Sequence, residues 1–198
     1  MLTNKRGCQE QAYPNMTIEL IWDKSDCAIE LKGVSIHAAP WEHPPFIYQA
    51  IVEEQDTNLL LTPQTHLTDP GKPAWYLANT LTDATIHKSG TVVLKGQQPK
   101  RLLAIVHDIE LNPTCQPEII AHAWQSVFDA IEENQFTVVA TPLLGTVHGK
   151  ISIQESLLIL NKCLQQTLPS CLKKMWLILP QDSGCELLVR LIKNDYND

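Results

Sequence analysis

A glycine-bearing segment at residues 141–150 has the composition of an anion-binding loop. Its central residues are Gly145, Thr146, Val147, His148 and Gly149. An apolar run precedes it, and Ser152 with Glu155 three residues later forms the capping-box signature of a helix start. A strand, a glycine loop and a helix in this order place free backbone N–H groups at one rim of a sheet, where phosphates and other anions bind. The alternative is a tight turn that only needs the conformational freedom of glycine.

Three well-known site motifs are absent from the sequence. A triphosphate loop needs G-x-x-x-x-G-K-[ST], whereas Gly145 to Lys150 is one residue short and Ile151 stands where the magnesium-binding hydroxyl belongs. No G-x-G-x-x-G follows a predicted strand, and G-x-S-x-G does not occur. A triphosphate cradle, a dinucleotide fingerprint and a nucleophile elbow are therefore not predicted.

Two histidines are candidates for catalysis. His148 lies in the glycine loop, where an imidazole could hydrogen-bond a phosphate or act as a general acid or base. His66 lies between Gln64 and Asp69 in a segment with no clear pattern. Each has a plainer interpretation as an exposed loop residue without a role, and the sequence favours that interpretation for both.

Other polar and aromatic residues have two interpretations each. His107 and Asp108 end a predicted buried strand, so they either face the ligand edge of an α/β sheet or simply end the strand. Trp75 and Tyr76 could stack on a base, but packing against the sheet is favoured. Trp124 lies on the apolar face of a predicted helix and is expected in the core.

The first half of the chain predicts mainly strands. Residues 16–22 and 27–36 alternate between apolar and polar and predict a hairpin around the turn at 23–26. The spacing of apolar residues in 46–55 predicts a short helix, and 58–62 predicts a short buried strand. Residues 63–90 are left without an assignment.

The second half alternates between strands and helices. We predict strands at 91–94, 102–106, 136–140 and 175–179, and helices at 116–134, 152–168 and 183–193. This βαβ repetition implies parallel strands with helices on both faces, and the hairpin adds antiparallel character. The fold class is therefore α/β, a three-layer α/β/α sandwich with a mixed central sheet. We expect one domain at residues 15–198 after a flexible lead-in at 1–14.

Composition narrows the functional classes. The chain has 198 residues, 44% of them hydrophobic, and a formal net charge of −7. This acidic balance disfavours nucleic-acid binding, and no apolar run is long enough to span a membrane. The six cysteines show no metal-ligand spacing, so we expect free thiols, no metal, no cofactor and a cytoplasmic protein.

Residues 90–192 resemble the macro domain family. Gly90 to Gly96 resembles the family's glycine-led strand, and Pro99 to His107 resembles the strand that follows it. Pro142 to Gly149 resembles the proline and glycine-rich loop that comes after the family's long helix. The resemblance rests on the order of the elements more than on identical residues.

This resemblance implies a function. Macro domains bind ADP-ribose at the carboxyl ends of their strands, and some remove ADP-ribose from proteins or metabolites. By resemblance, Gly145, Thr146, Val147, His148 and Gly149 would wrap the diphosphate and the distal ribose. The aspartate of the family's G-D-I-T motif has no clear match. The N-A-A-N segment should fall near Leu60 to Gln64, which reads LLTPQ.

Three hypotheses about function follow. The first is binding of ADP-ribose or a related nucleotide or anionic ligand through the Gly145–Gly149 loop. The second is a macro fold without a ligand that binds a protein partner. The third, ranked last, is hydrolysis of an ADP-ribosyl bond by His66 or His148.

Overall fold

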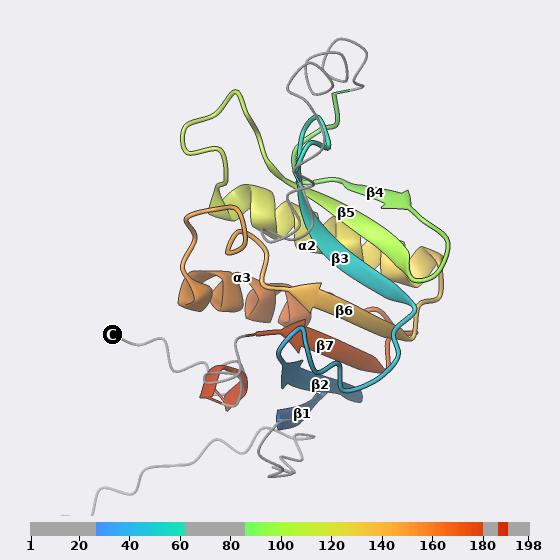
Figure 1. The fold of residues 1–198 in the computed structure, drawn as a ribbon. Coiled ribbons are helices and arrows are strands. Elements are labelled where there is room, and N and C mark those ends of the chain that lie inside the picture. Colours follow the sequence, from blue (N-terminus) through green and yellow to red (C-terminus); the bar gives the residue numbers. More distant parts are fainter. Residues whose placement is uncertain (1–26, 62–85, 180–185, 190–198) are drawn as a thin grey trace, which may run out of the picture.

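The computed structural model describes residues 27–61, 86–179 and 186–189 (Figure 1). Its strands are β1 (Cys27–Leu31), β2 (Val34–Ala39), β3 (Ala50–Asp56), β4 (Val92–Lys95), β5 (Lys100–His107), β6 (Val138–Pro142) and β7 (Lys174–Ile178). Its two long helices are α2 (Pro117–Glu133) and α3 (Ile153–Gln166), and residues 186–189 are also helical.

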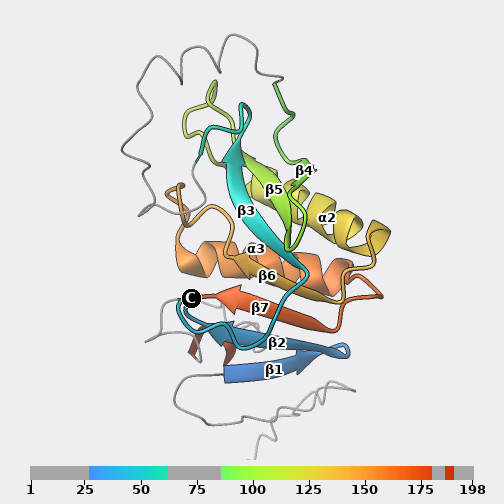
Figure 2. The same ribbon diagram turned by 45° about the vertical axis from the view of Figure 1, so that its right-hand side comes forward.

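The strands form one mixed sheet in the order β1-β2-β7-β6-β3-β5-β4. The five inner strands run parallel, and β1 and β4 pair antiparallel at the two edges. Helices α2 and α3 lie behind the sheet in both ribbon views (Figures 1 and 2). The predicted α/β class with a mixed central sheet is confirmed.

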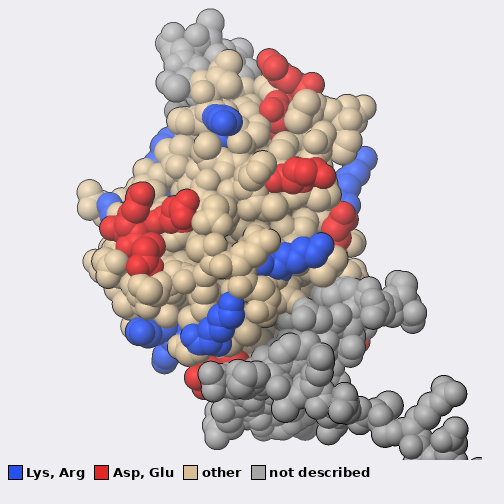
Figure 3. Space-filling view, turned by 180° about the vertical axis from the view of Figure 1, so that it is seen from behind, with Lys and Arg blue, Asp and Glu red and all other residues tan. Residues whose placement is uncertain are grey.

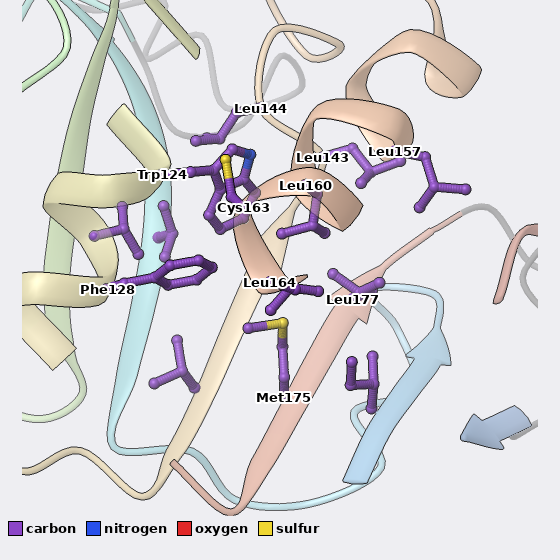
Figure 4. Packing of buried hydrophobic residues seen from close by; sticks show 14 of the residues in the cluster. Trp124, Phe128, Leu143, Leu144, Leu157, Leu160, Cys163, Leu164, Met175 and Leu177 are labelled. Atoms are coloured by element: carbon purple, nitrogen blue, oxygen red, sulfur yellow. The ribbon is translucent and has the colours of Figure 1, made fainter. Parts of the chain in front are cut away.

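The main core lies between the two helices and the sheet. Trp124 and Phe128 of α2 meet Leu160 and Leu164 of α3 above Met175 of β7 (Figure 4). Each of these side chains is at most 1% exposed, and the predicted core position of Trp124 is confirmed. Because both helices are anchored in this core, the connections from β5 to α2 and from β6 to α3 are held in place at their helical ends.

The opposite face of the sheet carries an aromatic cluster. Trp176 of β7 is 1% exposed and packs with small residues of the neighbouring strands. Trp41 stacks on it with ring centroids 5.9 Å apart, and Tyr48 lies at 5.6 Å. The connection from β2 to β3 thus crosses this face and covers its apolar residues.

The helix predicted at Phe46–Gln55 is wrong, because Ala50 to Asp56 form β3, a strand in the interior of the sheet. Ala50, Ile51 and Val52 are buried on both faces of the sheet, and such a short apolar run fits helix and strand patterns equally well. The strand predicted at 58–62 is also wrong, because residues 57–61 form the turn after β3.

The strand predicted at 27–36 is divided into two. Lys32 and Gly33 have φ values of 49° and 81°, which form a two-residue hairpin turn between β1 and β2. The partner strand predicted at 16–22 lies outside the described residues, as do residues 62–85 and the lead-in. Lys32 Nζ also donates to the Gln165 carbonyl at 2.8 Å, near the end of α3.

The elements predicted from residue 91 to 179 are confirmed, with shifts of one or two residues at their ends. Pro117 occupies the first turn of α2, as predicted. Ser152 is the N-cap of α3, and its side chain accepts a hydrogen bond from the Glu155 N–H at 3.2 Å. Of the helix predicted at 183–193, residues 186–189 are described, and they are helical.

The expectation of free cysteines holds in part. Cys115, Cys163 and Cys171 are free thiols. Cys27 is disulfide-bonded, which corrects the prediction at that position. Local sequence spacing could not show this, because a disulfide depends on which distant segments the fold brings together.

The surface over the helices carries charges of both signs. In Figure 3, basic side chains are scattered among acidic ones on this face, with uncharged surface between them. A continuous basic area suited to nucleic acid is not seen there. In the described part of the chain, no helix is long and apolar enough to cross a membrane.

We expect Ser152→Ala to lower the free energy of unfolding by about 1 kcal/mol, because the variant loses the N-cap acceptor of α3. Urea denaturation measures this difference. Ser152→Asp is the matched control, since aspartate restores an acceptor and should keep the wild-type value. An equal loss in both variants would show that the cap does not account for the effect.

Candidate functional site

The carboxyl ends of the parallel strands bring together the polar residues of the candidate site. Strands β3 and β5 are neighbours, with Glu54 near the end of one and His107 at the end of the other. The two residues are 3% and 4% exposed. His107 Nε2 lies 3.2 Å from Glu54 Oε2, so the imidazole and the carboxylate form a buried pair.

The loop after β6 closes around the same carboxylate. Glu54 Oε1 accepts hydrogen bonds from the N–H groups of Gly145 at 2.7 Å, Thr146 at 3.1 Å and Val147 at 3.1 Å. Oε2 accepts one from the N–H of His148 at 3.1 Å. We call these four N–H groups the amide nest. Consecutive amides that converge on one point are a known form of anion receptor.

Hydrogen bonds to the residues that follow it fix the shape of the loop. The Gly145 carbonyl accepts from the Ile151 N–H at 3.3 Å. The Leu144 carbonyl accepts from the Ser156 hydroxyl at 2.7 Å, and the Ser156 side chain belongs to α3. Leu143 and Leu144 are almost fully buried. The nest is therefore held by the core and by α3.

Both loop glycines are required by geometry. Gly145 has a φ of +85°, and a Cβ there would overlap with Cδ1 of Ile120 in α2. A Cβ on Gly149 would overlap with the Gly145 carbonyl oxygen. The interpretation as a tight turn that needs the conformational freedom of glycine holds for Gly145, whereas Gly149 is required because it has no Cβ. The same turn creates the amide nest.

Cys115 lies under the loop, with its Cβ 3.3 Å from the position of a Cβ on Gly149. Burial, and after it the negative charges of Glu54 and Glu155, raise the pKa of its thiol to about 12. The thiol is therefore protonated at neutral pH and is a poor nucleophile.

The predicted candidate residues are distributed as follows. The five loop residues lie together, and the rings of His148 and His107 meet edge to face with centroids 6.2 Å apart. His148 is half-buried. Asp108 accepts from the Ser89 hydroxyl at 2.8 Å and from the Glu110 N–H at 3.1 Å, so it orders its own turn. His66, Trp75 and Tyr76 lie outside the described residues.

Sequence reasoning missed Glu54, the residue at the centre of the site. Strand β3 ends in Glu53 to Asp56, and Leu60 and Leu61, at the start of the segment expected to match N-A-A-N, lie in the turn after it. Asp56 accepts from the Asn58 N–H at 2.7 Å and orders the turn that follows. A carboxylate next to a fully apolar run was the available signal, because a buried charge needs partners.

A pair of glycine variants tests how strictly the loop is fixed. Gly145→Ala should destabilise the protein more than Gly33→Ala, because both positions have φ near +80° but only Gly145 lacks room for a Cβ. Chemical denaturation measures both. Adding Ile120→Val, which removes Cδ1, should recover part of the Gly145→Ala loss. Equal losses at the two glycines would contradict the packing argument.

Comparison with known proteins adds information on the fold. No family model matches the sequence, and no curated protein matches it. Among solved structures, a mutant of the Oceanobacillus iheyensis macrodomain has a TM-score of 0.62 at 16% identity, covering 86% of this chain and 99% of that one. Another mutant of the same macrodomain, with ADP-ribose (ADPR), also has a TM-score of 0.62. Its sequence identity is 14%, and the match covers 86% of this chain and 98% of that one.

The macrodomain of Thermus aquaticus DarG is a further structural neighbour. Its TM-score is 0.53 at 14% identity, covering 73% of this chain and 98% of that chain. Because each of these structures is matched over nearly its whole length, the likeness extends to the complete layout of strands and helices. The chain therefore has the macrodomain fold.

Proposed function

We propose that this protein binds ADP-ribose or a related nucleotide at the carboxyl ends of its parallel strands, with an anionic group of the ligand on the amide nest. The observation that carries the proposal is the convergence of four consecutive N–H groups, from Gly145 to His148, on one carboxylate. Four donors aimed at one point are the arrangement that recognises a phosphate.

The structural neighbours support the choice of ligand. Structures of the Oceanobacillus iheyensis macrodomain contain ADP-ribose in one case and ADP in another. Both ligands carry a diphosphate, which could use several backbone donors at once. In this chain, the loop at 145–149 follows a parallel strand and precedes a capped helix, so its amides lie at the strand ends.

A second candidate function, binding of a protein partner without a nucleotide, has its own supporting observations. Glu54 already satisfies the nest, so the loop is complete without a ligand. Ile109, Leu111 and Val147 are 55%, 39% and 37% exposed, on the segments that follow β5 and β6. A contiguous exposed apolar patch on these segments would suit a protein-binding surface.

Hydrolysis remains the third hypothesis and gains no support. His66 lies outside the described residues, and the hydrogen bond of His148 to Glu54 comes from its backbone N–H, so it gives the imidazole no catalytic role. We therefore do not propose an enzymatic activity.

Calorimetric titration with ADP-ribose tests the first proposal. We expect saturable binding, and no comparable binding of adenosine, which has no phosphate. Val147→Pro removes one N–H of the nest and should weaken binding by roughly tenfold or more, since a hydrogen bond to a charged group is lost. Val147→Ala is the matched control, because it keeps the N–H and changes only an exposed side chain.

The opposite result would favour the second candidate. If neither the wild-type protein nor a Glu54→Gln variant, which removes the negative charge bound to the nest, gives heat with ADP-ribose at millimolar concentration, the nucleotide proposal is wrong. Binding that is insensitive to Val147→Pro would place the ligand away from the nest.

A further inference from the structure

The amide nest is filled by a group of the protein itself. Glu54 receives the four N–H groups of the nest and faces His107 Nε2, and its side chain is 1% exposed. A carboxylate so enclosed stays in place because its partners replace the water that it has lost. In this arrangement the nest is not free to accept an outside anion.

We propose that Glu54 is an internal competitor for the nest and thereby determines which ligands the site accepts. A ligand with a phosphate on the nest must first displace the Glu54 carboxylate. The inference rests on the proposed function only in assuming that the nest can hold an anion from outside.

Charge and position both support competition. A phosphate on the nest and the Glu54 carboxylate would be two anions sharing one set of donors, and like charges that close repel strongly in a buried site. The backbone of Glu54 is held by strand pairing, because Glu54 pairs with Ala104 of β5 and the start of β3, at Ala50 and Ile51, is also paired with β6. The side chain alone must leave.

The neighbouring residue provides a matched control. Glu53 is also a glutamate of β3, but successive side chains of a strand point to opposite faces. Its carboxylate accepts from Arg101 Nε at 2.9 Å and 3.0 Å and makes none of the hydrogen bonds of the nest. Replacing Glu53 therefore removes the same charge from the adjacent position of β3. It leaves the Glu54 carboxylate on the nest.

The first experiment replaces the missing carboxylate with a small molecule. Glu54→Ala should lower the melting temperature, because it leaves the four N–H groups of the nest without their acceptor. Acetate or propionate, compared with chloride at equal ionic strength, should raise the melting temperature of this variant in a saturable way. Wild-type protein and Glu53→Ala should show no such rise. A Glu54→Ala variant that is indifferent to these anions would overturn the proposal.

The second experiment uses Glu54→Gln, which keeps the shape of the side chain and removes its charge. The probe is inorganic pyrophosphate, with ADP-ribose as a second ligand, measured by calorimetry. We expect at least a roughly tenfold gain in affinity over wild type, since a charged acceptor no longer occupies the nest. Equal affinities of the variant and the wild type would overturn the proposal. This second experiment still tests the proposal if the Glu54→Ala variant does not fold.

The two proposals fail in different ways. If carboxylates stabilise Glu54→Ala and pyrophosphate binds Glu54→Gln, but ADP-ribose binds no variant, the competitor role stands and the nucleotide function is wrong. If ADP-ribose binds wild type and Glu54→Gln equally well at the nest, the nucleotide function stands and the competitor role is wrong. The effect of Val147→Pro on that binding shows whether the nest is the place of contact.

Discussion

The hydrogen bonds between the Glu54 carboxylate and the loop after β6 are the constraint on which this site depends. A charge buried on a central strand would be costly without donors, and a glycine loop with four inward-facing N–H groups would be costly without an acceptor. Each group satisfies the other. The Glu54 carboxylate joins β3 to the loop that leads to α3 and, through His107, to the end of β5, so the geometry of the site and the order of the sheet support each other.

The likeness to macrodomains shows the fold, whereas the chemistry of the site depends on the side chains of this protein. The identity to the matched structures is 14–16% for the Oceanobacillus iheyensis and Thermus aquaticus proteins, so individual side chains have to be judged on their own contacts. A shared fold can carry different functions, because function resides in the site. Here the backbone of the loop has the form of an anion receptor, while the end of β3 supplies an anion of its own.

The sequence predicted the parts of the structure that depend on local patterns. Helices α2 and α3 were found because each has a long apolar face and recognisable start signals at Pro117 and Ser152. Strand β3 was mistaken for a helix, because its apolar residues are too few to show a period and its burial comes from distant neighbours. The pairing of Glu54 with Gly145 joins residues that are 91 positions apart, and nothing in either segment alone reveals the other.

The contact of Gly145 with Ile120 determines how such a site can open. Because the loop is in close contact with α2 and bonded to α3 through Ser156, it cannot swing away as a lid without disturbing the core. If a ligand displaces Glu54 as proposed, the nest would be freed by rotation and hydration of that one buried side chain. This rotation would then govern the rate of ligand entry. The backbone would have nearly the same shape whether the nest holds the Glu54 carboxylate or a ligand.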